Sequence, residues 1–437
     1  MSRELASAPN QPSEISVRFG HAAAFAGQRA DDLATAASLL DGEAAAELQR
    51  LIDRARELRP LLREEQAATE ERGHYSSALH EIFWNEGFYR VLEPRRFGGL
   101  QLGVAAFYRV VAEVSRGCPS TGWCLCLGAG HSLQIASYFS EQAQQSVFGL
   151  HGQVVAASSG GGQKIELKRV EGGYRLSGIW RYCSGSPHST HFMPVVPGFS
   201  EDPSRPPETW WMLVERAQYE VLDDWGQVMG MRGSGSNSIR IDGAFVPEHM
   251  IVRSPDNFAA SGPSVGSRLH DDPVYAGAFR GFAEGEIAAV AVGLAMACVD
   301  ELEHLLGAPL RGQPGKVRAD HIDFQRAMGM ALATADASGA LSVRGGQLYE
   351  AMAKRSVAGI EPFSADRAMR VASLYFMSER MSWETVDQVL RAAGSSAMVR
   401  GHRLERYSRD ALTIRSRTDQ LEFDASAVGS VFLRSGK

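Results

Sequence analysis

The sequence predicts an α+β protein with a helical N-terminal part, a central β part and a helical C-terminal part. Two changes in the spacing of apolar residues indicate this order. The helical period gives way to strict alternation near residue 154 and returns near residue 287. The chain has 437 residues, which is enough for about two to four domains with sizeable hydrophobic cores.

The N-terminal part divides into a lead-in and a helical domain. The first 40 residues are mostly small and polar and include two prolines, so we expect them to be loosely ordered. The helical domain is expected over residues 41–150, and its first helix starts after Asp41 and ends or kinks at Pro60. Two more helices are expected, over residues 75–87 and 104–116.

The central β domain is expected over residues 151–255. Apolar and polar residues alternate on both sides of Glu171-Gly172-Gly173, which predicts a β-hairpin. Strand patterns continue at residues 210–214 and 238–242, and Pro247 ends the last strand.

The C-terminal helical bundle is expected over residues 256–437. Apolar residues recur at helical spacing from Ile287 to Leu305, and Gly307 stops this helix. A second long helix is expected over residues 369–390, with Gly394 as its C-cap.

Composition excludes several classes of partner. A formal net charge of −6 gives no field that would attract nucleic acid or acidic lipid surfaces. The longest apolar run, Ile287–Val299, is shorter than the ~20 residues that cross a bilayer, so it predicts a buried helix. Residues from Met1 onward carry no export pattern, and we expect the protein in the cytoplasm. Five cysteines without a Cys-x-x-Cys pair suggest neither a disulfide framework nor a zinc site.

Common catalytic motifs of hydrolases, P-loop enzymes and zinc proteases do not occur in the sequence. Ser158–Gly162 resembles a phosphate-binding loop, but it leads into a strand instead of opening a helix, so we interpret it as a strand-to-turn connection. Residues 182–188 and 231–237 place hydroxyls and glycines at strand ends, where backbone can approach a flat ligand. Ordinary turn chemistry explains the same residues equally well.

Several motifs, however, occur together and in the order of one known family. The chain resembles the acyl-CoA dehydrogenase fold over roughly residues 75–420, which implies a helical domain, a β domain and a helical bundle. The motifs that carry the resemblance are Arg95-Arg96-Phe97-Gly98-Gly99, Gly122-Trp123, Gly230–Asn237, Ala244–His249 and Arg409-Asp410.

Within that fold the chain is more similar to the oxygenase component of two-component flavin-dependent monooxygenases than to a dehydrogenase. His131 matches a family histidine near the substrate, and Ser159 matches a serine in the pocket. Ser184 matches the serine near the flavin N5, and Arg280 matches an arginine beside the isoalloxazine. The resemblance implies that reduced FMN or FAD arrives from a separate flavin reductase and reacts with O2. The resulting flavin hydroperoxide would oxygenate an aromatic or natural-product-type small molecule.

The resemblance also implies a set of site residues and a homotetramer assembled through the long C-terminal helices. Catalytic roles fall to Ser184, His131, Arg280 and Asp410. The residues expected to bind the flavin are Ser159, Ser184, Trp123, Arg232, Ser234, Ser236 and Arg280, and those expected to bind the substrate are His131, Ser159, Leu412 and Arg417.

One departure from the family pattern concerns the general base that would deprotonate the substrate. Phenol-hydroxylating relatives have one or two histidines after the Arg-Asp pair, where this chain has Leu412 and Arg417. A leucine accepts no proton and an arginine only donates. The base is then His131, His188 or Asp410, or else the substrate needs none. The glutamate base of acyl-CoA dehydrogenases also has no counterpart. A dehydrogenase or oxidase with tightly bound FAD, and a family member that has lost its chemistry, are the alternatives.

Overall fold

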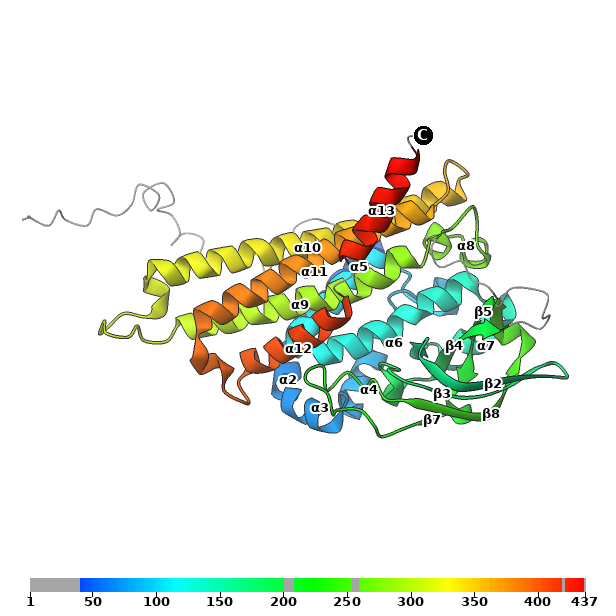
Figure 1. Cartoon of the computed structure of the whole chain (residues 1–437), viewed down its shortest axis with the longest axis horizontal. Coiled ribbons are helices and arrows are strands. Elements are labelled where there is room, and N and C mark those ends of the chain that lie inside the picture. The colour runs from blue at the N-terminus through cyan, green and yellow to red at the C-terminus, as the bar shows by residue number, and fades with distance from the viewer. Residues whose placement is uncertain (1–39, 200–207, 254–258, 419–420, 436–437) are drawn as a thin grey trace, which may run out of the picture. The chain divides into compact units, whose positions relative to one another are not determined.

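The computed structural model describes residues 40–199, 208–253, 259–418 and 421–435. The predicted lead-in therefore lies outside the described residues, apart from Leu40. Helices come first, strands follow, and long helices complete the chain, in the order that the sequence predicts (Figure 1). Residues 39–437 form one compact unit with a continuous hydrophobic core.

The N-terminal helices pack around a buried layer of apolar side chains. Their bounds are α2 (Gly42–Glu64), α3 (Gln66–Arg72), α4 (Ser77–Asn85), α5 (Val104–Gly117), α6 (Pro119–Tyr138) and α7 (Glu141–His151), with 3-10 turns η3 (Phe88–Arg90) and η4 (Arg95–Phe97). Helix α2 continues through Pro60 instead of ending there. Helix α6 was not predicted, because nearly all of its residues are buried and it therefore lacks an amphipathic period.

The β part consists of two sheets. One sheet has the order β1-β4-β5-β9, with β6 paired to β4, and the other has the order β2-β3-β8-β7. The predicted hairpin is confirmed as the β2–β3 pair, with Val170 opposite Gly173. The strand bounds are β1 (Ala156–Ser159), β2 (Gly162–Val170), β3 (Gly173–Trp180), β4 (His191–Phe199), β5 (Glu208–Met212), β6 (Val214–Glu215), β7 (Glu220–Val221), β8 (Ile239–Pro247) and β9 (Ile251–Arg253).

The end of β1 confirms the interpretation of Ser158–Gly162 as a strand-to-turn connection. Strand β1 stops at Ser159, and β2 begins at Gly162, so no helix opens at these glycines. Large aromatic side chains pack between the two sheets. Trp180 of β3 contacts Phe192 of β4 at a ring-centroid distance of 5.7 Å, and Tyr174 contacts Trp210 at 5.3 Å.

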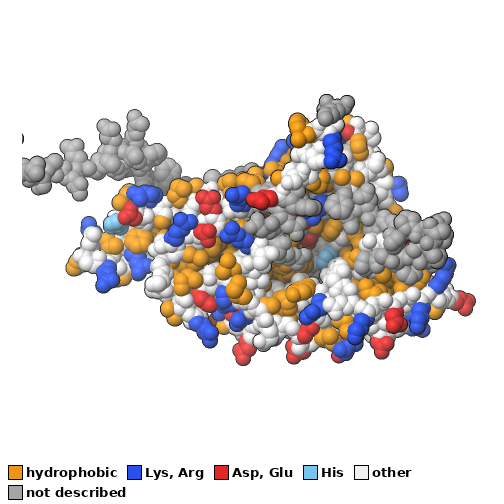
Figure 2. All heavy atoms as spheres, viewed as in Figure 1, with side chains coloured by type: hydrophobic (Ala, Val, Ile, Leu, Met, Phe, Trp, Pro, Cys, Tyr) orange, Lys and Arg blue, Asp and Glu red, His pale blue; other side chains and the backbone are white. Residues whose placement is uncertain are grey.

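Long helices dominate the C-terminal part, and α9, α10 and α11 lie side by side (Figure 1). Gly307 and Gly394 cap α9 and α11 as predicted. The bounds are α8 (Val265–His270), α9 (Arg280–Leu306), α10 (Ile322–Val357), α11 (Ala365–Ala393), α12 (Arg403–Thr418) and α13 (Leu421–Ser435). On the face drawn in Figure 2, acidic and basic side chains are interspersed without a single-sign patch.

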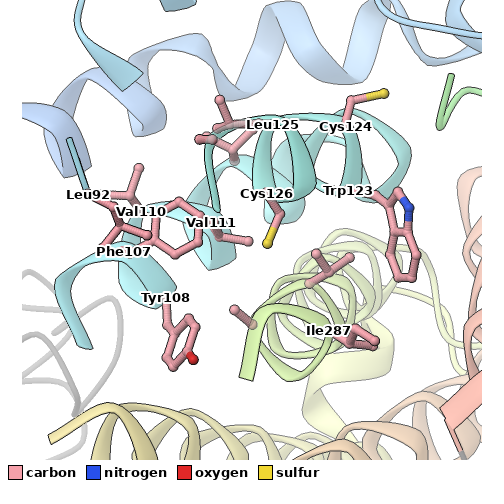
Figure 3. Close-up of a cluster of buried hydrophobic side chains, with 14 of the residues drawn as sticks. Leu92, Phe107, Tyr108, Val110, Val111, Trp123, Cys124, Leu125, Cys126 and Ile287 are labelled. Atoms are coloured by element: carbon pink, nitrogen blue, oxygen red, sulfur yellow. The ribbon is translucent and has the colours of Figure 1, made fainter. Parts of the chain in front are cut away.

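Helix α9 is the central helix of the core. Among the described residues it alone is long and apolar enough to cross a membrane, and 89% of its apolar window is buried inside the protein. Side chains of α5, α6 and α9 pack against one another in the cluster of Figure 3. A Cβ at Gly293 would lie 2.3 Å from the Ala112 carbonyl oxygen, so only glycine lets α5 and α9 approach this closely.

Candidate active site

A hydrogen-bonded chain joins three separate segments at the junction of α6 and the β part. Trp123 Nε1 of α6 donates to Ser184 Oγ, in the loop after β3, at 2.9 Å. Ser184 Oγ lies 2.8 Å from Ser236 Oγ, and Ser236 Oγ lies 2.8 Å from Ser234 Oγ, both in the loop before β8. We call Ser234, Ser236 and Ser184 the serine chain. All three side chains and Trp123 are buried, so four of the predicted flavin-binding residues meet at one place.

The two loops that carry the serine chain bond to each other through their backbones. Cys183 N–H donates to the Asn237 carbonyl at 3.1 Å, and Ser186 N–H donates to the Gly235 carbonyl at 3.2 Å. Gly185 and Gly235 have φ angles of +76° and +55°, which glycine adopts without strain. Pairing of this kind keeps Ser184 and Ser236 in register.

A cluster of aromatic rings packs behind the Ser184 loop. The His188 ring stacks on Tyr75 at 4.5 Å and on His80 at 4.6 Å, and meets His74 edge-on at 5.1 Å. His188 Nε2 donates to the Tyr75 carbonyl at 3.0 Å. Burial lowers the pKa of His188 to about 4, and the neighbouring histidines and Arg72 lower it further. His188 is therefore neutral at pH 7 and holds the loop.

His131 lies on the face of α6 that carries Trp123 and Leu127, because the three residues are spaced by four. Its Nδ1 donates to the Ala156 carbonyl of β1 at 2.7 Å, since a carbonyl can only accept. Burial lowers the pKa of His131 to about 4. The ring is neutral at pH 7, and its Nε2 carries a lone pair.

Ser159 and Arg232 bond to different loops, Ser159 to the loop after β3 and Arg232 to the loop before β8. Ser159 Oγ donates to the Arg181 carbonyl at 2.6 Å and accepts from Gly161 N–H at 3.0 Å, so it ties β1 to the loop after β3. Arg232 Nε donates to the Val228 carbonyl at 2.8 Å. Arg232 is half-buried at the edge of the loop that carries Ser234.

Arg280 stands at the first residue of α9. Its Nη1 lies 2.7 Å from Glu284 Oε1, and its guanidinium lies 6.0 Å from the centroid of the Phe376 ring. Four buried or half-buried tyrosines hold the backbone around it. Their hydroxyls donate to carbonyls of the segment that enters α9: Tyr349 to Val274, Tyr138 to Gly277, Tyr375 to Gly281 and Tyr108 to Phe282, at 3.2, 3.1, 3.1 and 2.6 Å.

The C-terminal candidates on α12 differ from one another. Asp410 is fully buried and its Oδ1 accepts from Met231 N–H at 2.5 Å. Burial raises the pKa of this carboxyl to about 7. Asp410 therefore positions the loop of the serine chain. The Leu412 side chain is 53% exposed, so within this chain it does not line a buried pocket. Arg417 belongs to α12, and its side chain lies outside the described part of the structure.

Sequence reasoning missed two side chains on the helical side of the site. Glu286 of α9 is buried, and a Cβ at Gly130 would lie 1.8 Å from its Oε1. Gln134 of α6 is buried three residues beyond His131. Glu286 directly precedes the apolar run that predicts a core helix, and no motif marks either residue.

The donors and acceptors at this site fit a reduced flavin. Neutral hydroxyl groups suit the edge heteroatoms of a flat ring. Gln134 Oε1 and Asn237 Oδ1 are buried acceptors without a hydrogen-bond partner among the described residues, and a ligand N–H can satisfy such groups. A separate surface hollow of about 470 Å³, lined by residues such as Arg175, Glu220 and Phe245, contains none of the site residues.

Comparison with known proteins first identifies the class to which the fold belongs. The family described as "Acyl-CoA dehydrogenase, C-terminal domain" matches residues 286–418. The structure is similar to that of XiaF from Streptomyces sp., which was solved with FADH2 and glycerol. The TM-score is 0.78 at 24% identity, over 90% of this chain and 96% of that chain. The predicted acyl-CoA-dehydrogenase-like fold is confirmed.

Sequence relatives then identify the activity. The "Pigment production hydroxylase" of Rhodococcus sp. (strain ATCC 21145) is 29% identical over 82% of this chain and 90% of its own length. The oxygenase subunit HsaA of a flavin-dependent monooxygenase from Rhodococcus jostii (strain RHA1) is 29% identical over 81% of this chain and 90% of its own length. The oxygenase component of the FADH(2)-dependent resorcinol hydroxylase from Rhizobium sp. (strain MTP-10005) is 28% identical over 83% of this chain and 88% of its length.

The chain is thus a flavin-dependent monooxygenase, an oxygenase component of the two-component type, as the resemblance predicts. The relatives favour this activity over the dehydrogenase or oxidase alternative.

Proposed function

We propose that this oxygenase binds reduced FMN or FAD delivered by a separate flavin reductase and oxygenates an electron-rich small molecule. The observation that carries this proposal is the serine chain, which presents buried neutral hydroxyls from two paired loops beside Trp123. Bound reduced flavin supplies two electrons for O2, so that one oxygen atom enters the product and the other leaves as water.

Each residue then has a defined task. Ser184 contacts the edge of the flavin ring, and Trp123 and Ser236 hold Ser184 in place. Arg280 stabilises negative charge on the reduced ring, because a guanidinium is charged at any physiological pH. Ser159 holds the Ser184 loop to β1. Burial of these groups excludes water from the site, which protects the activated oxygen.

His131 is the residue that we assign to the substrate. Its Nε2 lone pair can accept a hydrogen bond while Nδ1 is fixed on Ala156. Its lowered pKa of about 4 makes it a weak base at pH 7. His131 is therefore a poor general base for a substrate that requires deprotonation.

The remaining candidate bases have structural partners. His188 packs behind the Ser184 loop, and Asp410 accepts from Met231 N–H. We therefore propose a substrate that needs no deprotonation, such as an aromatic amine, an electron-rich heteroaromatic ring or an anion. Arg232 and Arg417 would suit an anionic or carbonyl group. One relative is named a resorcinol hydroxylase, so a phenol is the natural comparison substrate.

A panel of substrates tests this proposal. The purified chain receives reduced FMN from a supplied reductase under 18O2, with indole, aniline and phenol as probes, and product 18O and hydrogen peroxide are both measured. We expect 18O in the indole or aniline product and mostly peroxide with phenol. Efficient, well-coupled ortho-hydroxylation of phenol would show that the missing histidines do not redirect the chemistry.

Two further expectations concern the assembly and its location. The long helices α9 and α11 and the exposed apolar side chains of α13, including Phe432 at 75% exposure, support a homotetramer. Light scattering at micromolar concentration distinguishes this tetramer from a monomer. We also expect the enzyme to work in the cytoplasm, where reduced flavin is supplied by its reductase.

A further inference from the structure

We infer, on the basis of the proposed function, that the serine chain has a fixed direction. Ser234 donates to Ser236, Ser236 donates to Ser184, and Ser184 keeps its own proton for the bound flavin. Ser236 and Ser234 then act as positioning residues, because they determine what the Ser184 hydroxyl offers to the ligand.

Trp123 supplies the first constraint. An indole N–H can only donate, so one lone pair of Ser184 Oγ is occupied by Trp123 Nε1 at 2.9 Å. A hydroxyl has one proton and two lone pairs. The contact with Ser236 Oγ at 2.8 Å therefore uses either the proton of Ser184 or its second lone pair.

Burial of Ser234 decides between these two directions. If Ser184 donated to Ser236, then Ser236 would donate either to Ser234 Oγ or to the Ser234 carbonyl. The first choice leaves the Ser234 proton at the end of the chain without an acceptor. The second choice replaces a bond of 2.8 Å by a contact of 3.5 Å, which is too long for a good O–H···O bond. Ser234 is 1% exposed, and within the described part of the structure its hydroxyl bonds to Ser236 Oγ alone. A buried donor without an acceptor is costly, so this direction is disfavoured.

The opposite direction leaves one proton, that of Ser184, for the ligand. In this direction the protons of Ser234 and Ser236 both have acceptors at 2.8 Å. The Ser184 proton then has no acceptor among the residues that the structure describes, and it belongs to the residue that we place against the flavin. Both lone pairs of Ser184 are then occupied, so Ser184 is a donor to the ligand and selects a ring atom that accepts.

The decisive variants are Ser236→Thr and Ser236→Val, because threonine and valine have nearly the same shape and only threonine has a hydroxyl. Their difference isolates the hydroxyl from any packing effect. Ser236→Ala provides a second comparison with the wild type if either larger side chain prevents folding. Ser238→Ala is the matched control, since Ser238 is buried in the same loop and lies outside the serine chain.

The first readout needs no flavin. The indole N–H resonance of Trp123, assigned with Trp123→Phe, reports the strength of its bond to Ser184. If Ser236 donates to Ser184, then removing the Ser236 hydroxyl frees a lone pair and strengthens the Trp123 bond. We expect a downfield shift in Ser236→Val and Ser236→Ala and a return toward the wild-type position in Ser236→Thr. An upfield shift would mean that Ser184 donates to Ser236, which would overturn the inference, as would no shift.

The second readout is the Kd for reduced FMN, titrated anaerobically. We expect roughly two- to fivefold weaker binding in Ser236→Val than in Ser236→Thr, because the free Ser184 hydroxyl loses its orientation. Equal or tighter binding in Ser236→Val would overturn the inference. Ser184→Ala tests the proposed role of Ser184 toward the flavin separately from the direction of the serine chain. If Ser184→Ala binds reduced FMN and retains coupling like the wild type, then the proposed role of Ser184 is wrong, whereas the Trp123 resonance in the Ser236 variants still reports the direction of the chain.

Discussion

Asp410 of α12 and Met231, which are far apart in the sequence, are joined by a hydrogen bond of 2.5 Å from the Met231 N–H to Asp410 Oδ1. Arg409 supports the same loop by donating to the Met229 carbonyl at 3.0 Å. A Cβ at Gly230 would lie 2.1 Å from the Arg409 carbonyl oxygen, so this close approach requires glycine. Helix α12 therefore sets the position of the loop that carries Ser234 and Ser236.

The first prediction concerns the contribution of Asp410 to stability. Asp410→Ala leaves the buried Met231 N–H without its acceptor and should lower the free energy of unfolding by about 1–3 kcal/mol. Asp410→Asn keeps an oxygen that can accept this bond and should cost much less. Urea denaturation at pH 7 measures both variants. Equal losses in the two variants would contradict the role of the Met231 bond.

The second prediction concerns the pH dependence that Asp410 produces. Burial raises the pKa of its carboxyl from an ordinary value near 4 to about 7 in the folded protein. Between these values the folded state binds a proton that the unfolded state has lost. The contribution of Asp410 to stability is therefore full below about pH 4 and is lost as the pH rises through 7. Asp410→Asn should gain stability relative to the wild type from pH 5 to pH 8. A constant difference across this range would refute the raised pKa.

The third prediction concerns His188. Its pKa falls to about 4 in the folded protein, mainly because of burial, so the unfolded state binds a proton more readily as the pH drops below about 6.5. Stability is therefore lost as the pH falls toward 4. The rings of His74, His80 and Tyr75, which pack against His188, supply no negative charge that would stabilise a protonated His188 ring. His188→Phe should therefore lose less stability than the wild type between pH 7.5 and 5.

Urea midpoints at the two pH values measure this difference. His304→Phe, on the exposed surface of α9, is the matched control and should behave like the wild type. If His188→Phe has the same acid dependence as the wild type, then His188 is not the group that titrates.

The fold was largely predictable because amphipathic segments carry their period in the sequence. The β2–β3 hairpin, the caps at Gly307 and Gly394 and the strand end at Pro247 follow from local spacing and turn chemistry. Helix α6 was not predictable from its period, because a helix that is buried all round has no polar face.

The site was predictable only in part. Gly-Ser-rich strand ends marked the loops of Ser184 and Ser236, but the bonds from Ser184 to Trp123 and Ser236 span more than 50 residues each and leave no local pattern. Asp410 was predicted as catalytic from the resemblance, and its contact with Met231 depends on how α12 packs. Glu286 was not predicted as a site residue, because an isolated carboxyl beside an apolar run does not form part of a recognisable motif.

The fourth prediction concerns Arg280. Reduced flavin carries more negative charge than oxidised flavin, so loss of the guanidinium should affect the reduced form selectively. Arg280→Gln should weaken binding of reduced FMN roughly ten- to hundredfold and that of oxidised FMN much less. Glu284→Gln keeps Arg280 and removes its ion-pair partner, so it should not weaken binding of reduced FMN. Equal weakening of both flavin forms by Arg280→Gln would indicate a packing role.

The fifth prediction concerns Ser184. Ser184→Ala should fold normally, because the change removes one hydroxyl and no bulk, and should change the Kd for reduced FMN by less than roughly tenfold. Without this hydroxyl, water can enter beside the ring, so more hydrogen peroxide should escape per product formed. Peroxide and product are measured in the same reaction. Unchanged peroxide release would mean that the Ser184 hydroxyl has no role in coupling and that Ser184 serves only in the turn.

The central claim is that this monooxygenase takes diffusible reduced flavin instead of holding FAD tightly. The most direct test of this claim is to measure the flavin content and the flavin affinity of the purified chain. A monooxygenase that takes diffusible reduced flavin should be colourless after gel filtration and, under anaerobic conditions, should bind reduced FMN or FAD at least roughly tenfold more tightly than the oxidised form. A yellow protein that retains one FAD per chain through gel filtration and binds both redox forms equally would contradict the account.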